Sequence, residues 1–349
     1  MADDKWKQLD VRTDLALEAR ESFPGDGGEI AGVEVKEWNA AEERVKVTEV
    51  VILNQKGAEA MGKPVGTYLT LEALELAEKD EDFHQEVVEE LAGQIRKLMA
   101  KHHVWKNSEF AETGEFCQES DRGEISKNRI GRDGYEYRAP SVLVVGLGNM
   151  AATPDSLGPR VLENLQITRH LSLEYGKEFC ERSGYPVLSG LAPGVMAQTG
   201  METAEIVSGV VKETRPDMLI VVDALAARSA KRLGVTIQLS DTGIHPGSGV
   251  GNHRNQLTEE SLHVPVLAVG VPTVIGAAAV VHDTVDALVK ALEDGNESME
   301  TDENALYEWV REILAPEFGP MYVTPHDIDE RVKTLSYTIS EAIHEALFA

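Results

Sequence analysis

Four apolar runs in the second part of the chain constrain its fold more than any other feature. They read SVLVVGLG (141–148), DMLIVVDAL (217–225), GVTIQLS (234–240) and VPVLAVGV (264–271). Continuous apolar stretches such as Leu219–Val222 are typical of strands buried on both faces of a sheet. Segments near 157–175, 201–214 and 277–293 have helical spacing, and strands alternating with helices predict a mainly parallel sheet flanked by helices. The expected fold class is therefore α/β.

The rest of the chain adds strands and helices at both ends of this pattern. GVEVKEWN (32–39) and RVKVTEVVIL (44–53) alternate like strands, and GTYLTLEA (66–73) is either a third strand or the entry to a helix. Residues 82–103 and 326–347 have the periodicity of amphipathic helices. Residues 107–138 are polar, with few apolar anchors, and we expect them to form a long surface insertion.

Composition narrows the possible partners. The chain has 349 residues and a formal net charge of -27, which argues against direct binding to nucleic acid or to anionic membranes. A basic protein or peptide would be attracted, although a charge that only confers solubility explains the number equally well. The two cysteines suit a reducing compartment, and the N-terminus lacks the pattern of a signal peptide, so we expect a cytoplasmic protein.

The turn after the first apolar run poses a choice between phosphate binding and catalysis. Gly146 and Gly148 match two positions of a dinucleotide fingerprint, and Ala151 stands at the third. However, AATPDSLGP (151–159) separates the glycines from the next helix, and no acidic residue closes a second strand about twenty residues later. A nucleotide-binding regulatory module on the Gly146–Gly148 turn remains an alternative.

Two acids at the ends of apolar runs favour catalysis. Asp155 follows the first run, and Asp223 ends the otherwise apolar run MLIVVD. Sites in parallel sheets form beyond the carboxyl ends of the strands, where two carboxylates could share a proton or activate a water. The alternative is that each Asp only caps a following helix.

Other motifs give weaker signals. His245 and His253 flank the glycine-rich stretch that holds Ser248, and they could contact a substrate or belong to a simple turn. Asp241 begins the Asp-Thr-Gly tripeptide of pepsin-like proteases, but one copy in an α/β chain favours a loop residue. No His-Glu-x-x-His motif is present, and no cofactor site is expected, although a metal remains possible.

Longer motifs resemble one known family, the germination proteases of endospore-forming bacteria. The resemblance lies in DSLGPRV, TRHL, APGVMAQTGMETAEIV, VVDALAARSAKRL, TIQLSDTGIHPGSGVGNHR and VPVLAVGVPTV, in this order between Val142 and Thr273. VRTDLALEARE near the N-terminus and VTPHDIDERV near the C-terminus also resemble that family.

The resemblance implies a zymogen of a cytoplasmic endopeptidase that degrades small acid-soluble spore proteins, in the developing spore or the spore core. It implies a propeptide at 1–14, a single peptidase domain at 15–349, a homotetramer, and a core similar to hydrogenase maturation proteases. It also implies an unusual aspartic mechanism that falls on Asp155 and Asp223. The family has been classed with metalloproteases too, so a metal-dependent peptidase using the same acids as ligands is a further alternative.

The N-terminus contains a sequence similar to the family's substrates. Those are cut after an acidic residue in a pattern like Thr-Glu, Phe or Ile, Ala, a small residue and Glu. Thr13–Glu18 reads Thr-Asp-Leu-Ala-Leu-Glu, which predicts self-processing between Asp14 and Leu15. The alternative is an ordinary amphipathic helix capped by Thr13.

Overall fold

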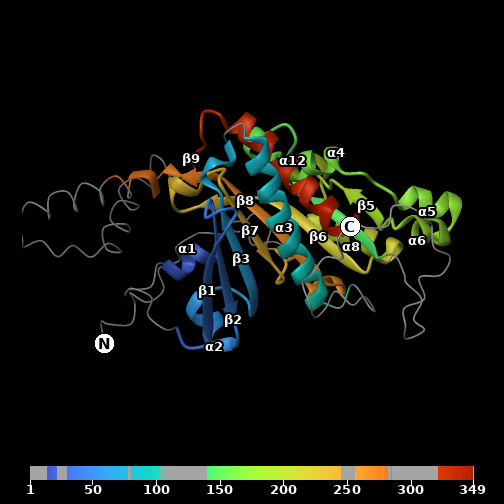
Figure 1. Cartoon of the computed structure of the whole chain (residues 1–349), viewed down its shortest axis with the longest axis horizontal. Helices are drawn as coiled ribbons and strands as arrows, with labels where there is room; N and C mark the ends of the chain where they lie inside the picture. Colours follow the sequence, from blue (N-terminus) through green and yellow to red (C-terminus); the bar gives the residue numbers. More distant parts are fainter. Residues whose placement is uncertain are drawn as a thin grey trace, which may run out of the picture.

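A single nine-stranded sheet organises the chain, shown as a computed structural model in Figure 1. The structure describes residues 14–21, 30–77, 80–102, 104, 140–244, 256–277, 279–281, 284 and 321–348. The strand order is β1-β2-β3-β7-β8-β6-β4-β5, with β9 paired to β8. The strands are β1 Val33–Ala40, β2 Val45–Ile52, β3 Gly66–Glu72, β4 Ser141–Gly146, β5 Val187–Leu191, β6 Met218–Ala227, β7 Thr236–Ser240, β8 Val266–Gly276 and β9 Tyr322–Val323.

The sheet is parallel in one half and antiparallel in the other. Strands β5, β4, β6 and β8 run parallel, as the apolar sequences of β4, β6 and β8 predict. The run GVTIQLS forms β7, which instead lies antiparallel to both β8 and β3. Only residues 228–235 connect β6 to β7, and this link is too short for the crossover of a dozen or more residues that a parallel connection needs. GTYLTLEA forms strand β3, so the α/β prediction is confirmed with an antiparallel extension.

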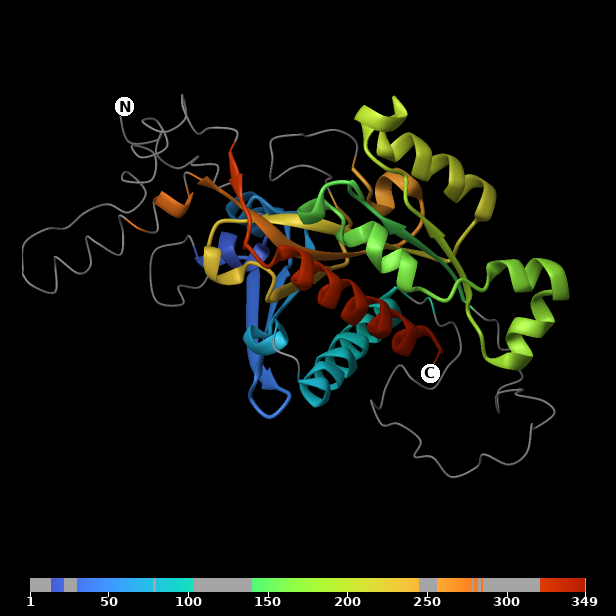
Figure 2. The same cartoon turned by 90° about the horizontal axis from the view of Figure 1, so that it is seen from above.

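Helices cover both faces of the sheet. The α-helices are α1 Ala16–Glu21, α2 Gln55–Met61, α3 Glu81–Lys101, α4 Leu157–Asn164, α5 Arg169–Tyr175, α6 Lys177–Ser183, α7 Met196–Thr199, α8 Thr203–Thr214, α9 Glu259–Leu262 and α12 Ile328–Phe348. Short 3-10 turns are η1 Leu74–Ala77, η3 Thr153–Asp155 and η4 Ala230–Arg232. In Figure 2, α3 (cyan) and α12 (red) lie on one side of the sheet and α8 (yellow-green) on the other.

The alternation of side chains along the central strands creates two cores. Val142 and Val144 of β4 face the large core formed with α3, α4 and α12, whereas Leu143 and Val145 face α8. Helix α3 turns a stripe toward the large core at helical spacing, made of Phe83, Val87, Leu91, Ile95 and Leu98. The described helices include none that is long and apolar enough to cross a bilayer.

The register of the parallel strands fixes where a site can form. Gly146, the last residue of β4, pairs with Val222 of β6, so Asp223 lies one residue beyond the end of β4. The chain leaves β4 for β5 on one side and returns to β6 on the other, which makes this edge the switch point of the sheet. Strand β6 continues to Ala227, so Asp223 lies inside the strand and not at its end as the sequence indicates.

The predicted insertion at 107–138 and most of the predicted helix at 277–293 lie outside the described residues. The predicted helix near 157–175 consists of α4 and α5, two separate helices. Strand β5 is missing from the predictions. Its sequence, Val-Leu-Ser-Gly-Leu, is short and carries Ser189 and Gly190 in the middle.

We predict that Gly146→Ala lowers the free energy of unfolding by about 1–3 kcal/mol, because overpacking a buried contact forces the backbone to shift. A Cβ at residue 146 would lie 2.2 Å from the carbonyl oxygen of Gly158 in α4. Denaturant titration measures the change. The control is Gly209→Ala in α8, where a Cβ meets nothing within 4 Å. Equal stability of wild type and Gly146→Ala would contradict the proposed close packing.

Candidate active site

A cavity of about 380 Å³ lies at the switch point, beyond the end of β4. It brings together both predicted acids and residues from the N-terminal segment, the α2–β3 loop, β6, β7 and β8. Its polar lining includes Asp14, Lys63, Tyr68, Asp155, Asp223 and Gln238. The sequence placed Asp155 and Asp223 at one edge of the sheet, and the structure shows that they line one space.

Asp155 is positioned by a tight turn that folds back on β4. Its carboxylate Oδ2 accepts a hydrogen bond from the amide of Asn149 at 2.9 Å, and its carbonyl accepts one from the same amide at 3.0 Å. Gly148 has a φ of +113°, and a Cβ there would lie 2.0 Å from the carbonyl oxygen of Asp155. Residue 148 must therefore be glycine for the backbone of Asp155 to pack against it.

Asp223 is a buried acid in the middle of the sheet, with 8% of its surface exposed. Its Oδ1 accepts a hydrogen bond from the amide of Ala224 at 2.9 Å. Burial raises the pKa of Asp223 well above its ordinary value, and the carboxylates of Asp155 and Asp14 raise it further. Burial also raises the pKa of Asp155, while the Asn149 amide opposes that shift. The two acids therefore differ, and Asp223 holds its proton more strongly.

Helix capping does not explain either acid. The residue before α4 is Ser156, and the carboxylate of Asp155 bonds to Asn149 instead of the helix amides. Asp223 lies within β6 and pairs with Gly270 of β8, so no helix follows it directly. Both capping alternatives are wrong.

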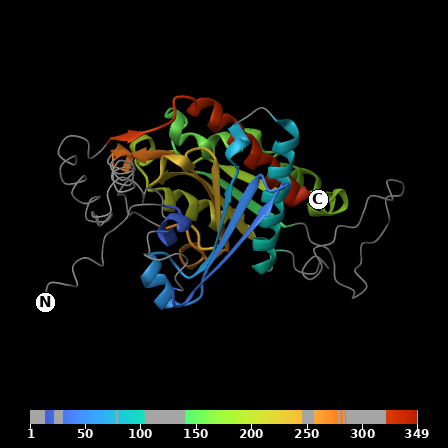
Figure 3. The ribbon, with the colours of Figure 1, turned by 60° about the vertical axis from the view of Figure 1, so that its left-hand side comes forward.

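The N-terminal segment crosses this cavity just before α1. The Asp14 amide donates to the carbonyl of Ala226 at 3.3 Å, and Asp14 Oδ2 accepts from the Ala226 amide at 3.0 Å. Leu15 and Ala16 have no exposed surface and belong to two different apolar clusters. Figure 3 shows α1 (dark blue) beside α2 and the antiparallel strands. The bond between Asp14 and Leu15 therefore lies against β6, outside the helix.

Glu18 anchors the other end of this segment. It is 2% exposed, and its carboxylate accepts hydrogen bonds from the amides of Arg228 at 2.8 Å and Ser229 at 3.0 Å. Arg232 lies 3.4 Å from the same carboxylate and also pairs with Glu21 and Glu72. Buried carboxylates need such charge-assisted partners. The segment is thus fixed by its acids at residues 14 and 18.

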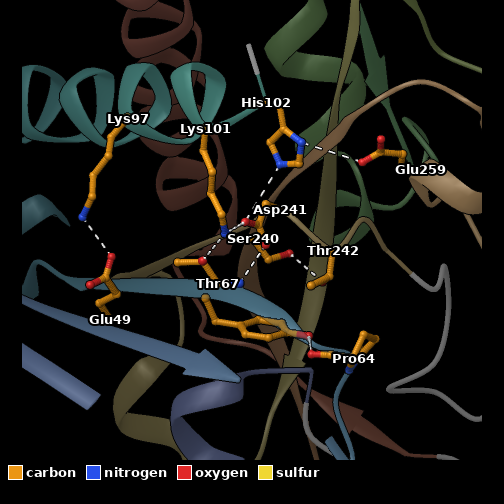
Figure 4. A network of polar contacts seen from close by, with 11 residues as sticks. Glu49, Pro64, Thr67, Lys97, Lys101, His102, Ser240, Asp241, Thr242 and Glu259 are labelled. Atoms are coloured by element: carbon orange, nitrogen blue, oxygen red, sulfur yellow. Dashed lines mark hydrogen bonds and ion pairs between the residues drawn. The ribbon is translucent and has the colours of Figure 1, made fainter. Parts of the chain in front are cut away.

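Asp241 belongs to a polar network, shown in Figure 4, that borders the cavity through Ser240 and Thr242. Its Oδ1 accepts from the Thr67 amide at 2.7 Å, Lys101 donates to its Oδ2, and His102 Nε2 lies 3.9 Å from that oxygen. The side chain is 5% exposed, and Asp241 is not among the residues lining the cavity. It connects α3 to β3 and the end of β7, which is a structural arrangement.

The remaining candidates cannot be placed. His245, Ser248 and His253 lie outside the described residues. Within the described ranges, no group of three or more His, Cys, Asp or Glu side chains is arranged to hold a metal ion. We assign no metal ligands.

Sequence reasoning missed three residues that contact the N-terminal segment. Lys63 follows α2, Gln238 lies on β7 and Arg232 is in η4. Gln238 interrupts the apolar strand Thr-Ile-Gln-Leu-Ser and is 8% exposed, so a polar side chain within a buried strand was an available signal. Lys63 and Arg232 follow from the tertiary arrangement and carry no local pattern.

We predict that Asp223→Asn makes the folded protein more stable at neutral pH. The pKa of Asp223 is raised in the folded state, so the unfolded chain loses this proton first as pH rises above about 4, and the free energy of unfolding falls. Asn does not ionise, so the variant does not lose this part of the free energy of unfolding as pH rises. The thermal midpoint should rise by about 2–4 °C at pH 8, the effect of ~1 kcal/mol in a large domain.

The difference between Asp223→Asn and wild type should shrink toward pH 4, where both states of the wild type carry the proton. Scanning calorimetry at a series of pH values measures it. A lower midpoint for Asp223→Asn at pH 8 would contradict the raised pKa.

Comparisons with known proteins agree with the motifs. The family model described as germination protease matches residues 11–114 and 135–307. A germination protease of Caldanaerobacter subterraneus subsp. tengcongensis is 43% identical over 353 residues, covering 97% of this chain and 94% of the relative. One from Priestia megaterium is 43% identical over 289 residues, covering 81% of this chain and 68% of the relative.

Among solved structures, a [NiFe] hydrogenase maturation protease, HycI from Thermococcus kodakarensis, matches with 15% identity and a TM-score of 0.28. The match covers 58% of this chain and 92% of that one, and a TM-score this low does not establish a shared fold. The sequence relatives carry the assignment: this chain belongs to the germination protease family and is a peptidase of spore germination.

Proposed function

We propose that this peptidase is made as a zymogen that cuts its own chain between Asp14 and Leu15 and then degrades small acid-soluble spore proteins. The observation that carries the proposal is the position of the substrate-like sequence. Asp14 lines the same cavity as Asp155 and Asp223, and Leu15, Ala16 and Glu18, which follow it in the substrate-like sequence, are buried in the protein. The chain holds its own substrate-like segment beside the two acids.

The two acids suit the hydrolysis of a peptide bond. In the proposed reaction, Asp155 is ionised and takes a proton from water as the water oxygen adds to the carbonyl carbon of residue 14. Asp223, whose pKa is raised further, carries the proton that passes to the leaving nitrogen of residue 15. The C–N bond breaks, giving a carboxylate on residue 14 and an amine on residue 15. One water is consumed, and no covalent intermediate forms.

The charge of the chain would favour a basic protein as substrate, although solubility explains the same charge equally well. The net charge of -27 attracts positively charged partners and repels nucleic acid. We further propose that the protein acts in the spore core and assembles as a homotetramer. Analytical ultracentrifugation tests the assembly, and a monomer at micromolar concentration would contradict it.

The first experiment replaces each acid. We predict that Asp155→Asn and Asp223→Asn each lower the rate of cleavage by about 10²–10⁴, because Asn has nearly the same shape but cannot transfer a proton. Cleavage of a spore protein is followed by gel and mass spectrometry, with circular dichroism to confirm the fold. A folded variant that cuts at the wild-type rate would contradict the assignment.

Asp241→Asn is the matched control for these two variants. It removes a buried carboxylate outside the cavity and should lower stability by about 1–3 kcal/mol while the folded protein still cuts. Complete loss of cleavage in folded Asp241→Asn would assign it a catalytic role. A parallel series with a strong chelator tests the metal-dependent alternative, because loss of wild-type activity would then assign a metal.

The second experiment follows self-processing against pH. The competent pair has a protonated Asp223 and an ionised Asp155, and rising pH removes the proton from Asp223. Processing should therefore accelerate as pH falls below neutral and slow again once Asp155 is protonated. N-terminal sequencing should show Leu15 as the new first residue. A flat rate from about pH 7.5 to 5.5, or a different terminus, would contradict the proposal.

A further inference from the structure

The carbonyl oxygen of Asp14 receives two side-chain donors that the mechanism above does not use. Lys63 Nζ donates to it at 2.9 Å, and Gln238 Nε2 donates at 3.2 Å. This carbonyl belongs to the peptide bond that we propose is cut. The two donors come from separate elements, the loop after α2 and strand β7.

Gln238 holds this part of the chain at two points. While its Nε2 donates to the Asp14 carbonyl, its Oε1 accepts from the amide of Ala16 at 2.7 Å. From the other side, the Ala226 amide donates to the carboxylate of Asp14 at 3.0 Å. Residue 14 is thus bonded by β7 through its carbonyl and by β6 through its amide and carboxylate, which restricts rotation of the peptide bond that carries the carbonyl.

Lys63 brings positive charge to an acidic cavity. Among the described residues lining it, Lys63 is the sole lysine or arginine, next to Asp14, Asp155 and Asp223. Burial lowers the pKa of Lys63 below its ordinary value, although the carboxylates of Asp14 and Glu18 oppose that shift. Gly62, with a φ of +60°, ends α2 in the left-handed conformation, and the chain then turns Lys63 toward the cavity.

We propose that Lys63 and Gln238 form the oxyanion site of this peptidase. When water adds to the carbonyl carbon of residue 14, its proton passes to a carboxylate and the carbonyl oxygen becomes negative. The Lys63 ammonium and the Gln238 amide already contact that oxygen in the starting state. Collapse of the intermediate restores the C=O bond and expels the nitrogen of residue 15, which takes a proton. Donors aimed at developing charge supply a large part of such catalysis.

This inference rests on the proposed self-cleavage, and its rival is that Lys63 only anchors the uncut segment. The two differ in what Lys63→Met changes. An oxyanion donor lowers the rate of bond cleavage and leaves the segment in place, whereas an anchor releases the segment. The test therefore needs the rate of self-cleavage and an independent measure of whether the N-terminal segment is still bound in the cavity.

The rate is measured by single-turnover processing of the full chain at mildly acidic pH. Lys63→Met should slow the appearance of the Leu15 terminus by about 10²–10³, the usual effect of removing one oxyanion donor. Lys63→Arg, which keeps an N–H donor, should recover part of the rate. Lys97→Met is the matched control, because Lys97 lies on α3, does not line the cavity, and pairs with Glu49 at 2.9 Å (Figure 4).

The binding of the N-terminal segment in the cavity is measured separately, on a variant that cannot cleave itself. In an Asp155→Asn background, hydrogen exchange at the Ala16 amide is compared with and without Lys63→Met. Unchanged protection together with the slower cleavage supports the oxyanion site. A cleavage rate within about threefold of wild type, or loss of protection in parallel with the rate, overturns it.

Two further outcomes keep the proposals apart. If wild type yields no Leu15 terminus, the proposed function fails and the oxyanion site fails with it. If wild type cuts, Asp155→Asn does not, and Lys63→Met cuts normally, only the oxyanion site fails. Should Lys63→Met not fold, Gln238→Met replaces it, with hydrogen exchange read at the Ala226 amide, which donates to the Asp14 carboxylate and does not bond to Gln238.

Discussion

The segment Asp14–Glu18 is held against β6 and the residues that follow it, and the arrangement of the site depends on this contact. The segment carries two acids into the protein, and each is held by backbone amides of the same stretch of chain. Ala226 binds Asp14, and Arg228 and Ser229 bind Glu18. Because these donors are backbone amides, they are present whatever the side chains at residues 226, 228 and 229, proline excepted, and they favour a carboxylate at each end of the segment. Leu15 and Ala16 then pack into two different apolar clusters, which places the peptide bond between Asp14 and Leu15 next to the cavity that Asp155 and Asp223 line.

The sheet could be predicted from the sequence wherever burial determines the pattern. Strand β1 was expected at 32–39 and runs Val33–Ala40, and β6 and β8 follow from apolar runs buried on both faces. The direction of β7 was not predictable from its own residues, because direction depends on the short link from β6. The short strand β5 was missed because its central Ser and Gly remove the apolar signal.

The candidate site was predictable only in part, for the same reason. Asp155 and Asp223 stand out because acids are rare beside such apolar runs, and the parallel register brings both to one edge. Lys63, Gln238 and Arg232 come from three elements separated in sequence, so their convergence on the N-terminal segment depends on strand order. The Asp-Thr-Gly tripeptide made Asp241 a possible substrate contact, but its side chain bonds to Lys101 and Thr67 and does not line the cavity.

The charges in the cavity would also disfavour the reverse of the proposed reaction, in which the peptide bond between Asp14 and Leu15 forms again. Before the cut, Asp14 already raises the pKa of Asp223, which favours the protonated form that the reaction needs. Hydrolysis converts the neutral carbonyl of residue 14 into a second carboxylate, next to Asp155 and Asp223. Like charges in a partly buried space repel, and Lys63 is the single described cation lining the cavity. The released acidic end is therefore destabilised where it is formed. Leu15 becomes an ammonium group, which the same acids attract. The arrangement that binds an acidic residue before the cut thus disfavours the acidic product after it and retains the new N-terminus.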